Sequence, residues 1–445
     1  MQAYFEALMA QLSAALAPQE GFTCWLSGED SCFVRFNHGL IRQPGEVRQA
    51  RLAFSLIGAS SADGTLHASA GFDLCHDLAQ DSAQLQQALQ DLRAQMQELP
   101  PDPHFLTATE VHSSTHCGDN QLPDSAAMVD DILDLAQGLD FVGVLAYGAM
   151  YRGFANHFGQ RNWHQGHSFN LDFSVYQNTD KAVKSSYAGN QWQRAALAAK
   201  LEDVRSQLEI LKLPPVSLQP GQYRVYLTPT ALQEIISMLS WDGVGEKALR
   251  TKQSCLRKMR DEGLRLHPSI QLSENTAGGL APAFSDEGFI KPDSVQLIQD
   301  GALVGSLIAP RTAQEYGLAT NGADGGEGMS AAHMAGGALA QEAILQALGT
   351  GVYISNLWYL NFSDRAHCRM TGMTRFASFW VENGKIKAPL AVMRFDDSLF
   401  DILGDKLEAL TAQTELLIDN ETYEERGDSC ARLPGALIRD FNFVL

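Results

Sequence analysis

Residues 141–177, FVGVLAYGAMYRGFANHFGQRNWHQGHSFNLDFSVYQ, are the stretch of sequence that decides the fold. Two long runs rich in aromatic and β-branched residues, 141–159 and 163–177, flank the short polar segment QRN. Runs of this composition on either side of a polar turn predict a long antiparallel strand pair. Residues 181–189, KAVKSSYAG, could add a third strand.

The rest of the amino-terminal half alternates strand-like and helix-like segments. Apolar residues at three- and four-residue spacing predict helices at 2–17, 78–98, 126–137 and 190–211. Clusters of Gly, Ser and Asp separate β-rich runs and predict a meander of short strands at 22–26, 32–37, 48–58 and 65–74.

A proline-rich break divides the chain. The segment LKLPPVSLQPGQY, 211–223, holds three prolines and a glycine, and 445 residues are too many for one simple core. We therefore expect an amino-terminal α/β meander domain, 1–215, and a carboxy-terminal domain, 220–445, that is rich in antiparallel strands and also has helices. Asp300-Gly301 and Asn383-Gly384 predict two hairpins in the second domain. The expected fold class is α+β.

Charge and composition exclude several classes of protein. The net charge is -19, from 33 Lys and Arg against 52 Asp and Glu, which argues against direct binding to nucleic acid. The densest basic run, 248–260, is expected to be a solvated helical face. No apolar run is long enough to span a bilayer, and the first helix lacks a positively charged leader, so we expect a cytoplasmic protein. The seven cysteines include no CxxC pair and are expected to be reduced thiols.

Common catalytic motifs are absent from the sequence. It has no HExxH pair for zinc, no GxSxG nucleophile turn and no GxxxxGK[ST] phosphate loop. The glycine-rich run NGADGGEGMSAAHMAGG, 321–337, lacks both the lysine and the spacing of a nucleotide loop and is expected to be a mobile loop. The motifs therefore predict no catalytic residue, metal ligand or cofactor.

Three histidines in the decisive stretch, His157, His164 and His167, raise the question of a metal site. Residues three apart on a strand point to opposite faces, so His164 and His167 would share an ion only if Gly166 formed a bulge. His157 and His164 could be cross-strand neighbours, but the turn has no carboxylate to add as a third ligand. The cluster is better explained as a polar hairpin that lines a cleft or an interface.

From about residue 220 onward the chain resembles the carboxy-terminal domain of the TldD/PmbA family. The stretches that carry the resemblance are YLTPTALQEIISMLS (226–240), the hairpin FSDEGFIKPDSVQLIQDGALVGSLI (284–308) and the region GVYISNLWYLNF to DDSLFDIL (351–403), which includes FWVENGKI. The amino-terminal half matches the family more loosely, as a helix, a meander and a long hairpin followed by a helix.

The resemblance also shows where this chain departs from the family. Members of the TldD type resemble zinc metallopeptidases, with HExxxH on the helix after the first strand of the domain and a cysteine near the chain end. Here the matching region, 234–247, has no histidine, and neither Glu234 nor Glu246 alone could hold zinc. Cys430 lies near the position of the terminal cysteine. The PmbA (TldE) type also lacks HExxxH and looks like the non-catalytic partner of a TldD-type subunit.

The resemblance therefore implies a metal-free subunit that helps to bind unfolded peptides and to present them to a zinc-bearing partner. Its partner could be a TldD-type zinc subunit or a second copy of the chain, and older family names mention modulation of DNA gyrase. The alternative is an independent homodimeric hydrolase, or a peptide-binding protein, with a site around His157, His164 and His167. Candidate peptide contacts in the cleft are Arg161, Trp163, His164, Asn361, Asp364, Arg365 and Arg375.

Overall fold

The computed structural model describes residues 1–178 and 180–444, and its fold is α+β, as predicted. The helices of the amino-terminal half are α1 (Gln2–Ala15), α2 (Leu78–Gln95), α3 (Ser125–Leu135) and α4 (Arg194–Leu211). Its strands are β1 (Gly21–Asn37), β2 (Leu40–Ser61), β3 (Gly64–Asp73), β4 (Ser114–Cys117), β5 (Asp140–Asn156), β6 (Arg161–Tyr176) and β7 (Ala182–Gly189).

These strands form one seven-stranded sheet in the order β3-β2-β1-β5-β6. The decisive stretch is the antiparallel pair β5 and β6, as predicted, and β6 also pairs with β4 near its start and with β7 near its end. The strands β1 and β2 turn at His38-Gly39, where both residues have positive φ, as a two-residue hairpin of type I′ requires.

The predicted division of residues 22–37 into two short strands is wrong, because β1 is continuous. Its polar middle did not look like strand, but Glu29 and Ser31 are buried there. Ser31 accepts a hydrogen bond from Arg426 of the carboxy-terminal half, so a distant segment supplies the partner that the local sequence lacks. The strand at 48–58 is likewise only part of β2.

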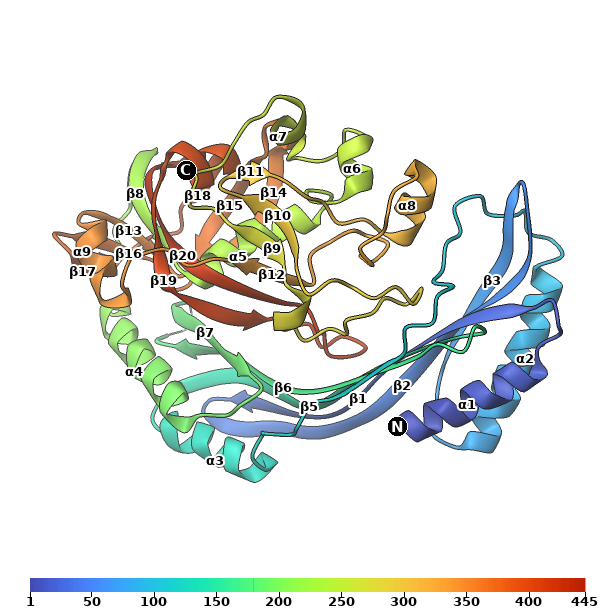
Figure 1. The fold of residues 1–445 in the computed structure, drawn as a ribbon. Coiled ribbons are helices and arrows are strands. Elements are labelled where there is room, and N and C mark those ends of the chain that lie inside the picture. Colours follow the sequence, from blue (N-terminus) through green and yellow to red (C-terminus); the bar gives the residue numbers. More distant parts are fainter. Residues whose placement is uncertain (179, 445) are drawn as a thin grey trace.

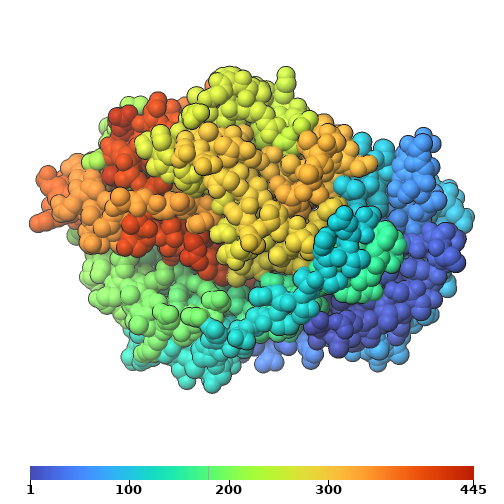
Figure 2. Space-filling view, viewed as in Figure 1, coloured from blue at the N-terminus to red at the C-terminus, as the bar shows by residue number. Residues whose placement is uncertain are grey.

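The amino-terminal sheet is curved, and its two faces have different neighbours. On the convex face, α1 and α2 cover one end of the sheet and α3 and α4 cover the other (Figure 1). The carboxy-terminal half lies on the concave face. In the space-filling view, the cyan segment that precedes α3 runs along the front of the junction between the halves (Figure 2).

The carboxy-terminal half is built on a thirteen-stranded sheet. Its strands are β8 (Gly221–Leu227), β9 (Leu272–Glu274), β10 (Val295–Gln299), β11 (Ala302–Leu303), β12 (Ala331–Met334), β13 (Gly351–Ile354), β14 (Asn356–Asp364), β15 (Arg369–Arg375), β16 (Phe379–Glu382), β17 (Lys385–Pro389), β18 (Arg394–Ser398), β19 (Leu407–Ile418) and β20 (Cys430–Phe443). Its α-helices are α5 (Pro229–Ser237), α6 (Glu246–Arg250), α7 (Arg257–Asp261), α8 (Pro310–Tyr316) and α9 (Ile344–Leu348). Short 3-10 helices lie at Met238–Ser240, Thr276–Gly278, Gln341–Ala343 and Arg365–His367, and a π-helix lies at Asp401–Asp405.

Strand β20 is central in this sheet, because β8, β12, β18 and β19 all pair with it. Most pairs are antiparallel, as expected, but β12–β20 and β8–β13 are parallel. Both predicted hairpin turns are confirmed: Asp300-Gly301 joins β10 to β11, Asn383-Gly384 joins β16 to β17, and all four residues have positive φ.

Two sequence interpretations need correction. The glycine-rich run 321–337 is not simply a mobile loop, because it contains β12 and a buried Glu327 that accepts the backbone N–H groups of Lys247 and Ala309. The basic run 248–260 is not one solvated helix, since Arg250 and Arg260 both donate to the buried Glu246. Although burial opposes it, the hydrogen bonds from Arg260, Ser306 and Arg250 lower the pKa of Glu246 to about 2.

Within the described ranges, no helix is long and apolar enough to cross a membrane.

Candidate functional site

A cleft of about 760 Å³ lies between the concave face of the amino-terminal sheet and the carboxy-terminal half. We call it the central cleft. Its polar and aromatic lining residues are Asn170, Asp172, Lys184, Ser186, Thr230, Gln233, Glu234, Ser237, Ser240, Trp241, Asn356, Trp358, Arg375, Phe376, Asp419, Asn420, Ser429 and Cys430. They come from β6, β7, α5, β14, β15 and the segments that flank the 419–429 loop.

Helix α5 forms one wall of the central cleft. Thr228 caps the helix through its side chain and Pro229 occupies the first turn, so the sequence fixes where α5 begins. The apolar residues Ala231, Leu232, Ile235 and Ile236 are buried in the core. Because a helix repeats every 3.6 residues, the polar residues between them face the cleft, namely Thr230, Gln233, Glu234 and Ser237.

Glu234 is the free acid of this wall. Its side chain is exposed in the cleft. The cleft walls still remove part of the water around its carboxyl group, and this desolvation raises the pKa of Glu234, whereas the charge of Lys184 lowers it. Lys184 itself lies 2.8 Å from the carboxylate of Asp172 across β6 and β7. Lys184, the cation that lowers the pKa of Glu234, is therefore already paired with the carboxylate of Asp172.

The part of the cleft wall formed by β14 and β15 carries an arginine close to two aromatic rings. The guanidinium of Arg375 lies 4.5 Å from the ring centre of Trp358 and 5.3 Å from that of Phe376. The pairing of β14 with β15 shifts register between Trp358 and Asn361, and Tyr359 in that bulge has positive φ. Bulges of this kind re-aim side chains, and Trp358 here remains half exposed.

Cys430 lies at one end of the cleft, at the start of β20. It is 9% exposed, and burial raises the pKa of its thiol to about 11. The thiol is therefore protonated at neutral pH in the metal-free protein.

The zinc that the resemblance implies for TldD-type members does not fit these residues. The cleft side of α5 offers the amide of Gln233, the carboxylate of Glu234 and the hydroxyl of Ser237, where zinc sites use imidazole, thiolate and carboxylate. Among residues 1–178 and 180–444, no group of three or more His, Cys, Asp or Glu side chains is arranged to hold a metal ion.

The three histidines of the decisive stretch do not converge. His164 faces the carboxy-terminal half, where its Nε2 lies 3.1 Å from the carbonyl oxygen of Leu280 and its ring stacks on His116. His167 is three residues further along β6 and therefore points to the other face of the sheet. His157 lies against Phe22, beyond the end of β5.

The suggestion that His157 and His164 are cross-strand neighbours is wrong, because the register places Arg152 opposite His164. Burial, and next the neighbouring His116, lower the pKa of His164 to about 4, so its imidazole is neutral at pH 7. A neutral, hydrogen-bonded imidazole at the junction of the two halves has a structural role in the contact between them.

The other amino-terminal candidates also lie outside the central cleft. Arg161 donates to the carbonyl oxygens of Asn156 and Gln160 and so closes its own turn. Trp163 is 3% exposed and packs against Phe5 of α1 on the convex face. Alternation along β6 explains this position, since odd-numbered residues from 163 to 171 face away from the cleft.

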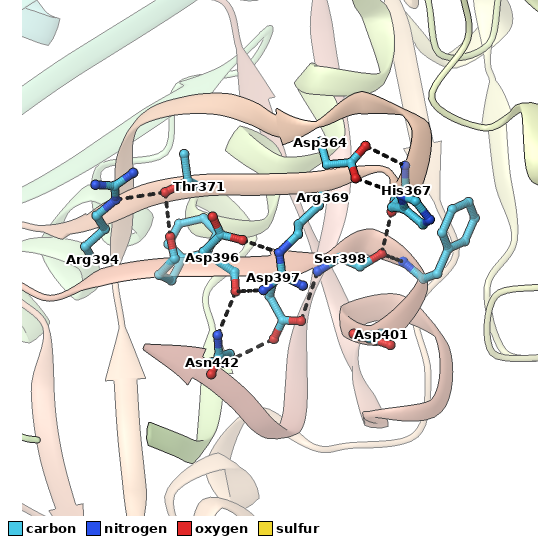
Figure 3. Close-up of polar contacts among 12 residues, drawn as sticks. Asp364, His367, Arg369, Thr371, Arg394, Asp396, Asp397, Ser398, Asp401 and Asn442 are labelled. Carbon is cyan, nitrogen blue, oxygen red and sulfur yellow. Dashed lines mark hydrogen bonds and ion pairs between the residues drawn. The ribbon is translucent and has the colours of Figure 1, made fainter. Parts of the chain in front are cut away.

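Three of the four carboxy-terminal candidates form local contacts on β14 and the turn after it. Asn361 accepts the N–H of Phe362, and Arg365 pairs with Asp242 at 3.2 Å. Figure 3 shows Asp364 directed at His367, whose Nδ1 lies 2.7 Å away. Of the seven candidates, Arg375 is the one that lines the central cleft.

The polar network in Figure 3 shows what the neighbouring charges do. Arg369 pairs with Asp396, and the buried Asp397 accepts hydrogen bonds from the backbone of Ser398 and Asn442. Lys406 also donates to Asp397, at 2.9 Å. These contacts tie β15, β18 and β20 together, so this network stabilises the sheet.

Sequence reasoning missed most residues of the central cleft, among them Asn170, Asp172, Lys184, Gln233, Ser237, Asn356 and Trp358. One signal was available. Gln233 and Ser237 are polar positions in an otherwise apolar helical pattern, directly after the first strand of the carboxy-terminal half.

Comparisons with known proteins agree with this architecture. Residues 220–444 match the family model described as the PmbA/TldA metallopeptidase C-terminal domain. "Metalloprotease PmbA" of Escherichia coli O157:H7 is 30% identical over 124 residues, which are 28% of this chain and 26% of that protein. The matched part thus spans about a quarter of the length of that curated relative.

Solved structures extend the likeness to the whole fold. TldE from Thermococcus kodakarensis superposes with a TM-score of 0.76 at 12% identity, over 99% of this chain and 100% of that one. A candidate modulator of a DNA gyrase from Thermotoga maritima gives a TM-score of 0.75 at 12% identity, with 99% and 100% covered. A candidate modulator of DNA gyrase from Bacteroides thetaiotaomicron gives 0.71 at 16% identity, with 99% and 98% covered. With half of its length matched by the family model, this chain belongs to the PmbA/TldD family of peptidase-like proteins.

Proposed function

We propose that this chain is a metal-free, non-catalytic subunit of a TldD/PmbA-type peptidase. It binds an unfolded peptide in the central cleft and presents it to a zinc-bearing partner subunit. The observation that supports this proposal is the composition of the α5 wall. Gln233, Glu234 and Ser237 stand where the family resemblance places a metal-binding helix, and they are groups that hydrogen-bond a peptide rather than grip zinc.

Open strand edges at the cleft favour an extended ligand. Within the described residues, β7 pairs only with β6. Strand β19 pairs with β20 and, at 410–412, with the segment 337–339, so residues 415–418 of β19 have β20 as their one strand neighbour. Lys184 and Ser186 of β7 and Leu417 and Ile418 of β19 line the cleft. An extended peptide can add to such an edge through main-chain hydrogen bonds, which select for unfolded chains and not for a particular sequence.

The setting we propose is cytoplasmic, with residues 1–215 and 220–445 acting as two domains. The partner is either a TldD-type zinc subunit or a second copy of the chain. Direct contact with nucleic acid is not part of the proposal, since the net charge of -19 would repel a phosphate backbone.

Co-purification with a TldD-type subunit from the same organism tests the proposal. Each chain alone and the mixture are assayed for cleavage of an unfolded peptide, with and without a chelator, and the zinc content of each sample is measured. We expect cleavage in the mixture above that of the zinc subunit alone, and less than stoichiometric zinc in this chain. Chelator-sensitive cleavage by this chain alone would overturn the proposal.

The second candidate, a hydrolase or peptide-binding site on the histidine hairpin, receives less support from the contacts. His164 is engaged with Leu280 and His116, and His167 points to the opposite face. The same assay separates the two candidates. Activity of the isolated chain that is lost in His164→Ala, while His112→Ala keeps it, would favour the hairpin site.

A further inference from the structure

Arg375 is a cation in the central cleft with no acidic partner. Among the ion pairs of residues 1–178 and 180–444, the nearby arginines Arg365 and Arg369 are matched with Asp242 and Asp396, but Arg375 is not matched with any carboxylate. The chain has 52 acidic residues against 33 basic ones, so a guanidinium without an ion pair in the central cleft is open to an acidic ligand.

Two aromatic rings lie beside the guanidinium of Arg375. The ring centres of Trp358 and Phe376 are 4.5 Å and 5.3 Å from its central carbon, within the range of cation–π contacts. Trp358 reaches Arg375 diagonally, because the sheet register places Met373 opposite Trp358 and Asn356 opposite Arg375. The N–H edge of a guanidinium matches a carboxylate in a two-pronged contact.

The other charges of the cleft do not compete for this role. Lys184 is paired with Asp172, and the remaining charged residues of the lining, Glu234 and Asp419, are acids. The cleft thus offers an anion one preorganised donor on the β14–β15 wall, with the polar side chains of Gln233 and Ser237 on the wall formed by α5.

We propose that Arg375, with the rings of Trp358 and Phe376 beside it, binds a carboxylate of the peptide in the central cleft. The inference rests on the proposed function and adds the chemical class that the cleft selects. The carboxylate could belong to the carboxy terminus of the peptide or to an Asp or Glu side chain, and the guanidinium edge recognises both in the same way.

The test uses the full chain and four fluorescently labelled unfolded peptides of one sequence. They combine a free or an amidated carboxy terminus with an internal Glu or Gln, and dissociation constants are measured by fluorescence anisotropy. We expect wild type to prefer one carboxylate source, which identifies it. Arg375→Gln is expected to weaken that peptide roughly tenfold or more, since charged hydrogen bonds are the strong ones.

Two further variants make the result specific. Arg375→Lys keeps the positive charge but loses the planar pair of N–H donors and much of the contact with the aromatic rings. It should therefore bind the peptide more tightly than Arg375→Gln and more weakly than wild type. Arg365→Gln is the matched control, because Arg365 also lies over an aromatic ring, 4.9 Å from that of Phe362, but pairs with Asp242 outside the cleft. The affinity of the Arg365→Gln variant for each peptide should equal that of wild type. Thermal unfolding confirms that each variant folds.

The outcomes separate this inference from the proposed function. If all four peptides bind wild type equally, or if Arg375→Gln weakens all four equally, carboxylate recognition is wrong while peptide binding in the cleft stands. If none of the four binds wild type, both are overturned.

Discussion

The junction beside the β5–β6 hairpin and the central cleft use polar residues in opposite ways. At the junction, hydrogen bonds between the two halves involve the polar groups of His164, Arg426 and the turn at 285–288. In the cleft, Glu234 and Arg375 keep theirs free. The histidines that are crowded in sequence belong to the junction, whereas the cleft is assembled from distant segments. Here the histidines that are close together in sequence belong to the contact between the two halves. Glu234 and Arg375, which form no ion pair within the described residues, line the cleft, where we expect the ligand to bind.

This difference predicts that junction variants lose stability and that cleft variants lose binding. Four substitutions test the separation, beginning with the one that should cost most.

Arg426→Met should have the largest effect on stability. Arg426 is 3% exposed and donates to the carbonyl and hydroxyl oxygens of Ser168 and to Ser31, beside the buried Glu29. Removing a buried cation leaves those acceptors and a buried acid without it, which typically costs about 3–5 kcal/mol. Urea unfolding measures the loss. The matched control is Arg51→Met, since Arg51 pairs with Asp73 at the surface, where about 0–1 kcal/mol is expected. Equal losses in both variants would contradict the role of Arg426.

Glu287→Gln should change how stability depends on pH. Glu287 lies in the turn that contacts Ala108 of the amino-terminal half, and one of its carboxylate oxygens is buried without a partner. Burial, and next the adjacent Asp286, raise the pKa of Glu287 to about 8. The unfolded chain ionises near 4.5, so unfolding releases a proton between these values and stability falls as pH rises from about 4.5 to 8.

In Glu287→Gln that decline should be reduced, while the surface variant Glu110→Gln should keep the wild-type slope. Urea midpoints at several pH values from 5 to 9 measure the slope. An unchanged slope in Glu287→Gln would show that the turn does not hold a neutral acid.

The sequence predicted the elements well where local signals decide them. Asp300-Gly301 and Asn383-Gly384 need positive φ at both turn residues, and the chain supplies residues that tolerate it. The prediction of secondary structure failed where contacts with distant parts of the chain determine it. The polar middle of β1 is strand because it pairs with β2 on one side and β5 on the other, and Arg426 of the other half donates to the buried Ser31.

The site was harder to predict than the fold for the same reason. Arg375 lines the cleft and stays a prediction as a peptide contact, whereas Trp163, which also lies among aromatics in sequence, faces the opposite side of the sheet. Only the strand register, which pairs β6 with β5 and β7, separates the two faces. Asp172 and Lys184 meet across that register and carry no local signal at all.

His164→Ala should have a smaller effect, of about 1 kcal/mol at pH 7, from the lost hydrogen bond to Leu280 and the lost stacking on His116. It should also remove an acid sensitivity. With the folded pKa lowered to about 4 and the unfolded one at its ordinary 6.5, the unfolded chain binds the extra proton, so wild type loses stability as pH falls from 6.5 to 4. Urea midpoints over this range check the slope, and His112→Ala, at an exposed histidine, should leave it unchanged.

Glu234→Gln should affect stability least, by under about 0.5 kcal/mol, because its side chain is open to the cleft. Its effect should appear in binding. Burial raises the pKa of Glu234, so wild type adds a negative charge to the cleft only as pH rises above the ordinary range of the group. A carboxylate peptide on Arg375 should then bind more weakly at higher pH, and Glu234→Gln should flatten that dependence. Anisotropy titrations between pH 5 and 8 measure it, with the amidated Gln peptide as the control that should not respond. If the dependence survives in Glu234→Gln, the acid of the α5 wall and the arginine opposite it do not act on the same ligand, and the cleft holds two separate sites.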